Sequence, residues 1–272
     1  MLSPAQIDQF NTRGFCVLER AMSPQQLSSV RAAADELVKA SVNGEPYPPS
    51  YLREGETYGA INKSSRLFFS NRCEHFPGFE GFVKGELVAA IARDLLGPNV
   101  FLFNEQVVVK APRHGDSFAW HQDSGYVRFK HRAFLTLWCA LDDATRDNGT
   151  VYLIPRDLRK ETTVSTHEWE ENGSNLVGYR GTEHGEMIEV AAGSIVAFSS
   201  LTMHRTGANN TDRPRRALVC QYSAEPLLRG FNSSDWTSAQ AIGTMMAVRT
   251  VMDGIPSARI KPMTKKAVRI PR

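Results

Sequence analysis

The chain has 272 residues, of which 42% are hydrophobic, 9% aromatic and 22% charged. This ordinary composition excludes a disordered, collagen-like or coiled-coil protein, and the length favours a single β-barrel or β-sandwich of about 200–250 residues with helical additions. Lys and Arg number 32 and Asp and Glu number 29, so the formal net charge is only +3. Because the basic residues are scattered rather than gathered in a stripe, we expect no nucleic-acid binding.

The cysteines and the N-terminal sequence favour a reducing compartment. None of the four cysteines belongs to a C-x-x-C pair, and Cys16, Cys139 and Cys220 lie in apolar runs. Such cysteines behave as small buried hydrophobic residues, so we expect neither disulfides nor a thiolate zinc site. There is no signal-peptide pattern and no stretch near the ~18 consecutive apolar residues of a membrane helix. We therefore expect a soluble, cytoplasmic protein that does not bind a membrane.

The first hundred residues have a mostly helical pattern. Ser3-Pro4-Ala5-Gln6 is a typical helix start, and Ser23-Pro24-Gln25-Gln26 repeats it before an amphipathic helix. Between these two starts, the apolar run Phe15–Leu18 predicts a short strand. The Pro-rich stretch Gly44–Tyr58 predicts a loop, and Gly85–Leu96 predicts another helix.

From residue 100 onwards the pattern changes to short runs rich in β-branched and aromatic residues, separated by turn signals. Strands at this density, without intervening helices, predict an antiparallel sandwich or jelly roll. The expected strands are Val100–Phe103, Gln106–Lys110, Phe118–Asp123, Ala133–Leu141, Thr150–Ile154, Glu186–Val190, Ser194–Phe198 and Arg215–Ser223. The polar segment 155–185 is typical of a lid or a disordered loop. A further helix is predicted over Ser238–Met252, ahead of a basic tail.

The sequence Trp120-His121-Gln122-Asp123 holds the first candidate site. Side chains at positions i and i+2 of a strand project from the same face, so His121 and Asp123 can share a metal ion. His204 is the best candidate for a third ligand, because it lies at the end of another predicted strand. Two histidines and one carboxylate match the facial arrangement of non-haem Fe(II) oxygenases better than the ligand sets of zinc hydrolases. A His-x-Asp pair alone is weak evidence, since an isolated pair is more often structural.

Arg215 opens an apolar strand that follows His204. A buried arginine needs an anionic partner, and its planar guanidinium suits the far carboxylate of a dicarboxylate co-substrate. Arg216 fits the same role on pattern alone, because strand register does not show which of the two side chains points inward. A surface ion pair is the alternative for either residue.

Several motifs follow one another in a recognisable order along the chain. They are Trp120-His121-Gln122-Asp123, Trp138, Arg146-Asp147-Asn148-Gly149-Thr150 leading to Pro155, Gly193-Ser194 with Phe198, His204-Arg205-Thr206-Gly207-Ala208-Asn209 and Arg215-Arg216-Ala217-Leu218. In order and spacing they resemble the phytanoyl-CoA dioxygenase family over roughly residues 1–225. The resemblance implies a mainly β fold with α elements, a double-stranded β-helix (jelly roll, cupin-like) buttressed by N-terminal helices.

On this resemblance we expect a single domain over residues 1–272. A mostly helical buttress would cover 1–99 and the β-helix core would cover 100–224. The core would carry the lid insert 155–185, and residues 225–272 would form a C-terminal extension. We expect this extension either to close over the site or to form a dimer contact, in a protein that is a monomer or a homodimer.

The resemblance also implies Fe(II) as the cofactor, with 2-oxoglutarate and O2 as co-substrates. His121, Asp123 and His204 would be the iron ligands. Arg215 would bind the C5 carboxylate of 2-oxoglutarate, since the family's spacing selects it over Arg216. Four further residues match co-substrate-binding positions of the family, and ordinary strand packing is the alternative for the first three. These residues are Gln106, Trp138, Thr206 and Lys63.

Two positions bear on the reaction and its substrate. Where the family often has Pro-Gly-Ser-His, this chain has Pro155-Arg156-Asp157-Leu158, so we expect a different substrate choice. Related halogenases replace the carboxylate of the His-x-Asp pair by a small residue. The presence of Asp123 therefore favours oxygen insertion or oxidation over halogenation.

The predicted function is hydroxylation of an unactivated C–H bond of a small metabolite, while 2-oxoglutarate and O2 become succinate and CO2. The alternatives are a cupin-like metalloenzyme that needs no 2-oxoglutarate and a non-catalytic small-molecule-binding barrel. Basic loop residues favour an anionic or zwitterionic substrate. The candidates for lining the entrance are Tyr126, Arg128, the segment 155–185 with Arg159, Tyr179 and Arg180, and the C-terminal region. The alternative for each single residue is a solvated loop position.

Overall fold

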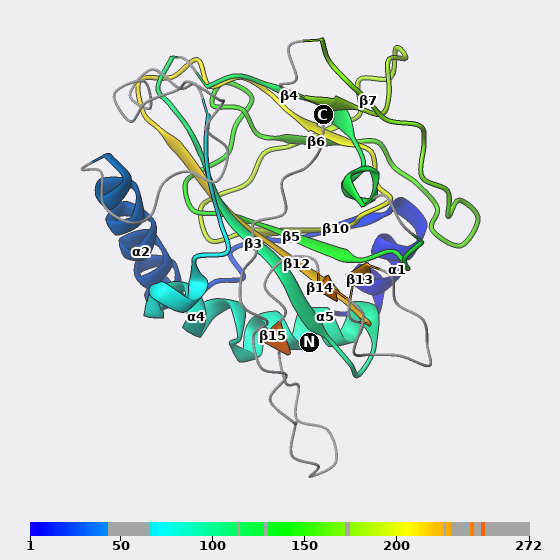
Figure 1. Cartoon of the computed structure of the whole chain (residues 1–272), viewed down its shortest axis with the longest axis horizontal. Coiled ribbons are helices and arrows are strands. Elements are labelled where there is room, and N and C mark those ends of the chain that lie inside the picture. The colour runs from blue at the N-terminus through cyan, green and yellow to red at the C-terminus, as the bar shows by residue number, and fades with distance from the viewer. Residues whose placement is uncertain are drawn as a thin grey trace.

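The computed structural model describes residues 1–42, 66–113, 115–127, 130–171, 175–225, 227–229, 240–241 and 246–247. A larger and a smaller antiparallel sheet face each other, and helices cover the outer face of the larger sheet (Figure 1). This arrangement agrees with the expected mainly β fold buttressed by N-terminal helices. None of the helices in these ranges combines the length and apolarity that a membrane crossing requires.

The described α-helices all lie in the first hundred residues. The first begins with the expected capping box, in which the Ser3 hydroxyl accepts the Gln6 N–H and the Gln6 side chain accepts the Ser3 N–H. Ser23 and Gln26 exchange the same two hydrogen bonds at the start of the second helix. The helices are α1 (Pro4–Arg13), α2 (Pro24–Val42), α4 (Pro77–Val83) and α5 (Glu86–Leu96), with the short 3-10 helices η1 (Cys73–His75) and η2 (Asp123–Tyr126).

The larger sheet has seven strands. They are β1 (Phe15–Leu18), β2 (Arg66–Ser70), β3 (Phe101–Lys110), β5 (Leu135–Ala140), β10 (Ile195–Ser199), β12 (Arg215–Ser223) and β15 (Met246–Ala247). Their order is β1-β10-β5-β12-β3, and the free edge of β3 pairs with β2 along one half and with β15 along the other.

The smaller sheet has four strands in the order β4-β11-β6-β9. They are β4 (Phe118–His121), β6 (Val151–Leu153), β9 (Glu186–Ile188) and β11 (His204–Thr206). Two further ladders pair β7 (Glu168–Trp169) with β8 (Leu176–Val177) and β13 (Leu228–Arg229) with β14 (Gln240–Ala241). The predicted lid insert 155–185 therefore contains the short β7–β8 ladder.

Alternation along the strands of the larger sheet divides the core into two layers. In β5, Leu137 and Cys139 pack with the helices, whereas Trp138 and Ala140 face the space between the sheets. The four cysteines are buried free thiols, as expected. The inner layer is the one that reaches the candidate site, so residues on the Trp138 face are the ones that can act in it.

Some elements differ from the expectations because long-range pairing decides them. The strands expected at 100–103 and 106–110 are one strand, β3, since the residues between them also pair with β12. The strand expected to run to Asp123 ends at His121. Neither β2 nor α4 was predicted, and β2 owes its conformation to pairing with β3.

The helix predicted over 238–252 is wrong at residues 240–241 and 246–247. These residues form β14 and β15, because pairing with β13 and β3 outweighs the local helical pattern. The other residues of that predicted helix, and the loop predicted over 44–58, lie outside the described residues.

Candidate metal and co-substrate site

Two histidines of the smaller sheet lie directly opposite each other. His121 ends β4, His204 begins β11, and antiparallel pairing makes the two residues cross-strand partners. His121 Nδ1 lies 2.8 Å from the carbonyl oxygen of Ala119. His204 Nδ1 lies 3.0 Å from the carbonyl oxygen of Thr202. Because a carbonyl oxygen only accepts, each Nδ1 donates a proton, and each Nε2 keeps a lone pair for a metal ion.

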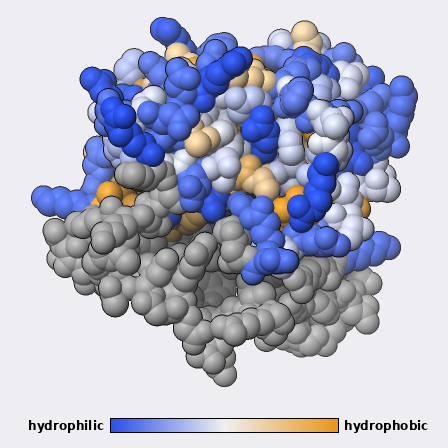
Figure 2. Space-filling view, turned by 90° about the horizontal axis from the view of Figure 1, so that it is seen from above, coloured by the Kyte–Doolittle hydropathy of each residue, from blue (hydrophilic) through white to orange (hydrophobic). Residues whose placement is uncertain are grey.

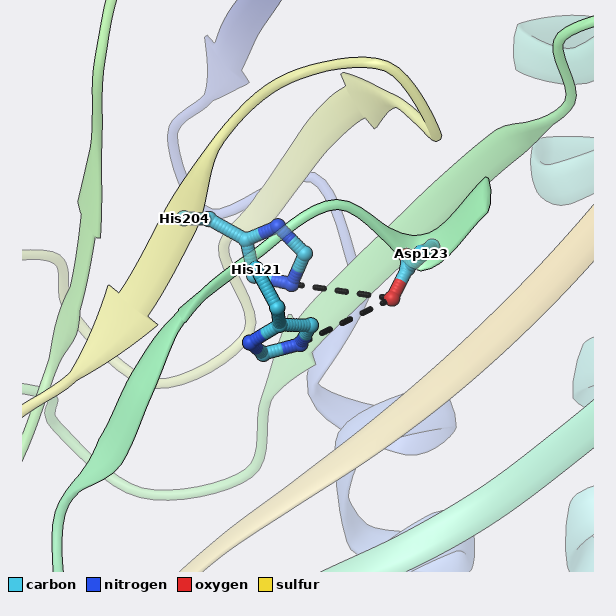
Figure 3. A group of neighbouring side chains, drawn as sticks. All are labelled: His121, Asp123 and His204. Atoms are coloured by element: carbon cyan, nitrogen blue, oxygen red, sulfur yellow. Dashed lines mark ion pairs between the residues drawn. The ribbon is translucent and has the colours of Figure 1, made fainter. Parts of the chain in front are cut away.

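Asp123 completes the group from the start of η2 rather than from the strand. Gln122 keeps an extended backbone between β4 and η2, and this turns the Asp123 side chain towards both imidazoles. Asp123 Oδ1 lies 3.9 Å from His121 Nε2 and 3.6 Å from His204 Nε2 (Figure 3). One ligand atom from each residue lies within 4.8 Å of the other two. Metal–ligand bonds of about 2 Å can span such a group after small side-chain movements.

The three side chains are shielded from water. The side chains of His121 and Asp123 are 10% and 11% exposed. Burial, together with the nearby His204, lowers the pKa of His121 to about 3. The ring is therefore neutral at physiological pH, and the neutral imidazole is the form that binds a metal ion.

Thr136 orients Asp123, and the sequence analysis did not identify it. Thr136 Oγ1 on β5 donates a hydrogen bond to Asp123 Oδ2 at 2.5 Å. Oδ1 is therefore the carboxylate oxygen that faces the two histidines. Strand alternation was the available signal, because Thr136 lies two residues before Trp138 and shares its face of β5.

Arg215 is buried at the start of β12, with hydrogen-bond donors to spare. It is 1% exposed, and its Nη2 donates to the carbonyl oxygen of Gly149 at 3.0 Å. Its guanidinium carbon lies 5.3 Å from the ring centre of Trp138. In the part of the chain that the structure describes, Arg215 Nε, Arg215 Nη1 and Thr206 Oγ1 are buried without a hydrogen-bond partner. Buried donors in this state indicate a place for an acceptor that the chain itself does not supply.

Only glycine fits at position 149, whose carbonyl oxygen accepts the hydrogen bond from Arg215. Its φ is +86°, a left-handed conformation, and a Cβ on it would lie 2.5 Å from the carbonyl oxygen of Gly207. Asn148 supports this turn by accepting the Thr145 N–H at 2.8 Å and donating to the Asp143 carbonyl at 2.7 Å. The Asn-Gly turn noted in the sequence thus has a defined task beside Arg215.

Arg216 points to the opposite face of β12. Its guanidinium donates to Asp142 at 2.7 Å and also pairs with Asp35 of α2. These carboxylates raise the pKa of Arg216 further above its ordinary range. Arg216 is therefore already ion-paired, and of the two arginines only Arg215 faces the space between the sheets.

Lys110 forms a row of basic side chains with its neighbours, and the sequence analysis assigned it no role. It is the cross-strand partner of Arg215 on β12 and of Arg66 on β2. Lys110 is fully buried, and its Nζ donates to the carbonyl oxygens of Asp116 and Gly207, each at 2.5 Å. Burial, followed by the charges of Arg215 and Arg66, lowers the pKa of Lys110 to about 6.

Gln122, between the two ligands of β4 and η2, fastens the insert 155–185 to the site. Its Nε2 donates to the carbonyl oxygens of Leu201 at 2.5 Å and Thr163 at 3.3 Å. Its Oε1 accepts the Ser165 N–H at 2.7 Å, and its own N–H donates to His167 Nε2 at 2.9 Å. The predicted lid is thus anchored directly beside the candidate metal ligands His121 and Asp123.

Arg156, which belongs to the segment that replaces the family's Pro-Gly-Ser-His, forms hydrogen bonds beside the site. Its Nη1 donates to the Leu201 carbonyl at 2.7 Å and its Nη2 donates to Thr163 Oγ1 at 3.2 Å. These are two of the residues that also contact Gln122. Arg156 therefore adds a second attachment between the insert and the turn that leads into β11.

The remaining candidate residues are dispersed. Gln106 lies on β3 at the same level of the sheet as Trp138, since both pair with Val219. Arg159 forms an ion pair with Asp8 of α1 at 2.6 Å. Arg180 is exposed, and Tyr179 packs edge-on against Trp120. Lys63 and Arg128 lie outside the described residues.

Two aromatic side chains lie at the edge of the site. The ring of Tyr126 is 5.6 Å from that of His121, and the ring of Trp169, from β7 in the insert, is 6.1 Å from that of Tyr126. Tyr126 and Trp169 are 46% and 45% exposed. The described surface seen from above is largely hydrophilic (Figure 2). Among the described residues, Tyr126 and Trp169 are two of four exposed large hydrophobic side chains, with Met1 and Val164. Trp169 lies in the segment 155–185 that was predicted to line the entrance, although the residue itself was not singled out.

Comparison with known proteins identifies both the fold and the family pattern. The model of the phytanoyl-CoA dioxygenase (PhyH) family matches residues 10–217. The chain is 25% identical, over 79% of each chain, to the 2-aminoethylphosphonate dioxygenase of uncultured bacterium HF130_AEPn_1. It is 24% identical to the probable alpha-ketoglutarate-dependent hypophosphite dioxygenase of Stutzerimonas stutzeri, over 86% of this chain and 84% of that one.

A solved structure confirms the expected jelly roll. EctD from S. alaskensis, solved with 2-oxoglutarate and 5-hydroxyectoine, superposes with a TM-score of 0.66. The match covers 91% of this chain and 86% of EctD at 20% sequence identity. At this identity the likeness establishes the shared fold.

We expect His121→Ala to remove most of the metal affinity, because it deletes one of the three candidate ligands that the described part of the chain brings together. Mn(II) binding, followed by the loss of the free-ion electron paramagnetic resonance signal, should weaken by more than about 100-fold. His184→Ala is the matched control, since His184 is exposed in the insert. Equal Mn(II) affinity in the two variants would show that the metal binds elsewhere.

Proposed function

The chain belongs to the phytanoyl-CoA dioxygenase family, and from this premise we propose that His121, Asp123 and His204 bind Fe(II) and that Arg215 binds 2-oxoglutarate. The protein is a non-haem Fe(II)- and 2-oxoglutarate-dependent dioxygenase, as its dioxygenase relatives and the jelly-roll fold indicate. The observation that carries the residue assignment is the convergence of two metal-facing Nε2 atoms on Asp123 Oδ1.

The donor set suits Fe(II). Two neutral imidazoles and one carboxylate form a facial set that leaves open positions, whereas zinc sites are usually tetrahedral. When bound, Fe(II) supplies the activation of O2, which is coupled to conversion of 2-oxoglutarate to succinate and CO2 and to hydroxylation of the substrate. The chain contributes ligand orientation through the carbonyls of Ala119 and Thr202 and through the hydroxyl of Thr136.

The region around Arg215 suits the far carboxylate of 2-oxoglutarate. Among the described residues, Arg215 Nε and Nη1 are buried donors without a partner, so the guanidinium can donate further hydrogen bonds to a carboxylate. Thr206 offers a further unpaired hydroxyl, and Trp138 packs beside the guanidinium. Lys110 adds a second basic group whose described partners are carbonyl oxygens and not a carboxylate. An anion at this position would satisfy the buried donors and balance the buried charge.

We propose further that the substrate is a small anion or zwitterion, with a phosphorus oxyanion as the first candidate. The two relatives reported above are named for 2-aminoethylphosphonate and hypophosphite, which are both small phosphorus oxyanions. The basic row Arg66–Lys110–Arg215 favours such ligands, because Arg66 and Arg215 are cationic and Lys110 becomes cationic when a bound anion raises its pKa. Tyr126 and Trp169 would form the outer wall of the substrate site.

The function is tested by succinate formation from 2-oxoglutarate in the presence of Fe(II) and O2. We expect slow succinate release without substrate and faster release with the right compound from a panel of methylphosphonate, 2-aminoethylphosphonate, hypophosphite and proline. Stimulation by the phosphorus compounds alone would support a phosphorus oxyanion as the substrate. Stimulation by proline alone would contradict that candidate and leave a zwitterionic substrate. Metal binding without any succinate would favour an enzyme or binding protein that does not use 2-oxoglutarate.

Arg215→Ala should raise the requirement for 2-oxoglutarate and leave the metal affinity unchanged. Truncating one partner of a buried charge-assisted contact weakens binding by about 30-fold or more. Titration of the Mn(II)-loaded protein with 2-oxoglutarate measures this loss directly. Arg216→Ala is the matched control, because Arg216 is paired with Asp142 and Asp35 on the other face of β12. A larger loss in the Arg216 variant would reverse the assignment.

Binding of 2-oxoglutarate should take up a proton at neutral pH. Without an anion, the pKa of Lys110 is about 6, because burial and the charges of Arg215 and Arg66 outweigh that of Asp116. A carboxylate bound at Arg215 raises this pKa, so Lys110 gains a proton when the co-substrate binds. By linkage, the affinity for 2-oxoglutarate falls as pH rises from about 6 towards the raised pKa.

Calorimetric titration of the Mn(II)-loaded protein in two buffers of different ionisation enthalpy measures this proton uptake. Lys110→Met should abolish the uptake, because no titrating group then remains beside Arg215 on β3. An unchanged uptake in this variant would assign the proton to another group.

A further inference from the structure

A row of polar side chains crosses the inner face of the larger sheet and ends at Asp123. Gln221 on β12 is the cross-strand partner of Asn104 on β3 and of Thr136 on β5. Asn104 Nδ2 lies 2.8 Å from Gln221 Oε1, and Gln221 Nε2 lies 3.4 Å from Thr136 Oγ1. Thr136 Oγ1 lies 2.5 Å from Asp123 Oδ2. Side chains of the three neighbouring strands β3, β12 and β5 thus form one hydrogen-bonded row that ends at an oxygen of the Asp123 carboxylate.

The chemistry of the last acceptor determines the direction of every bond in the row. An ionised carboxylate only accepts, so the Thr136 hydroxyl must use its single proton on Asp123. The hydroxyl can then only accept from Gln221, which must present its NH2 group to Thr136. Gln221 therefore turns its carbonyl oxygen to Asn104, which donates. All the donors point towards Asp123, and bonds aligned in one direction polarise and strengthen one another.

Burying this row of polar side chains in the protein interior costs free energy. Thr136 and Gln221 are buried, and the neighbouring inward positions Trp138 and Val219 are apolar. The sheet is also irregular at this point: Gln221 pairs with Asn104 and Tyr222 pairs with Leu102, so the register shifts past Phe103. Such a bulge redirects a side chain, and here it accompanies the placement of Asn104 beside Gln221.

We propose that Thr136, supported by Gln221 and Asn104, is a positioning residue that engages Asp123 Oδ2 and leaves Oδ1 as the single carboxylate ligand. This inference rests on the proposed function, in which Asp123 binds Fe(II) with His121 and His204. A carboxylate that bound through both oxygens would occupy a further coordination position. The facial set is useful to this reaction because it leaves three positions for 2-oxoglutarate and O2. By holding Oδ2 away from the metal ion, the polar row keeps the remaining coordination positions free for 2-oxoglutarate and O2.

The test compares metal and co-substrate binding in two variants of Thr136. Thr136→Val keeps the shape and removes the hydroxyl, so we expect Mn(II) affinity to fall by about 10- to 100-fold. We also expect a loss of 2-oxoglutarate affinity in the protein saturated with Mn(II). Thr136→Ser keeps the hydroxyl and should restore both affinities. Electron paramagnetic resonance and calorimetric titration measure both quantities without turnover.

Thr150→Val is the matched control for the loss of a buried hydroxyl. Thr150 is fully buried on the approach to β6, and its hydroxyl donates to the carbonyl oxygen of Ile188 rather than to a candidate ligand. We expect its metal affinity to equal that of the wild type. The proposal is overturned if a folded Thr136→Val protein binds Mn(II) and 2-oxoglutarate as the wild type does, or if Thr136→Ser is as impaired as Thr136→Val.

Gln221→Leu tests the rest of the row and keeps the proposal testable if Thr136→Val does not fold. It should weaken Mn(II) binding several-fold in the wild type, because Thr136 loses the donor that polarises its hydroxyl. It should have no further effect when combined with Thr136→Val, since the connection to Asp123 is then already broken. An unchanged Mn(II) affinity in the Gln221→Leu variant would contradict the proposal that Gln221 supports Thr136.

These results separate this inference from the proposed function. If His121→Ala retains Mn(II) binding, the metal site itself is wrongly assigned and both proposals fail. If His121→Ala loses Mn(II) binding while Thr136→Val retains it, the metal assignment stands and only the positioning role of Thr136 is refuted.

Discussion

The pairing of β4 with β11 is the constraint on which the site depends. It places His121 directly opposite His204, and a slip of either strand by one residue would turn one imidazole to the other face. Lys110 holds the outer ends of both strands, because its Nζ binds the carbonyl of Asp116 before β4 and that of Gly207 after β11. One buried side chain of the larger sheet thereby anchors both histidine-bearing strands.

Buried basic side chains give the interior its preference for anions. Arg215 and Lys110 are adjacent and almost fully buried, and the partners described for them are carbonyl oxygens. Burial lowers the pKa of both side chains, to about 10 for Arg215 and about 6 for Lys110. A dicarboxylate bound at Arg215, as proposed, would relieve this cost and couple co-substrate binding to the charge state of the interior.

Local patterns predicted the elements whose conformation depends on near neighbours in the chain. The capping boxes at Ser3 and Ser23 and most strands of the barrel belong to this group. The elements that were missed or wrongly predicted share one cause, which is pairing with a strand distant in the sequence. β2 forms because β3 lies beside it, and residues 246–247 form a strand instead of a helix because they also pair with β3. Periodicity alone carries no information about such partners.

By itself, the sequence determined the family, the expected fold and the residue types of the site, because His121, Asp123, His204 and Arg215 lie in ordered motifs. Strand pattern alone left Arg215 and Arg216 equivalent and the family's spacing favoured Arg215, but only the tertiary structure showed that Arg216 is ion-paired while Arg215 keeps buried donors without a partner. The hydrogen bond from Thr136 to Asp123, the attachment of the insert through Gln122 and the charge row through Lys110 were also decided at that level. The physical reason is that sheet register and strand alternation, not distance along the chain, bring these groups together.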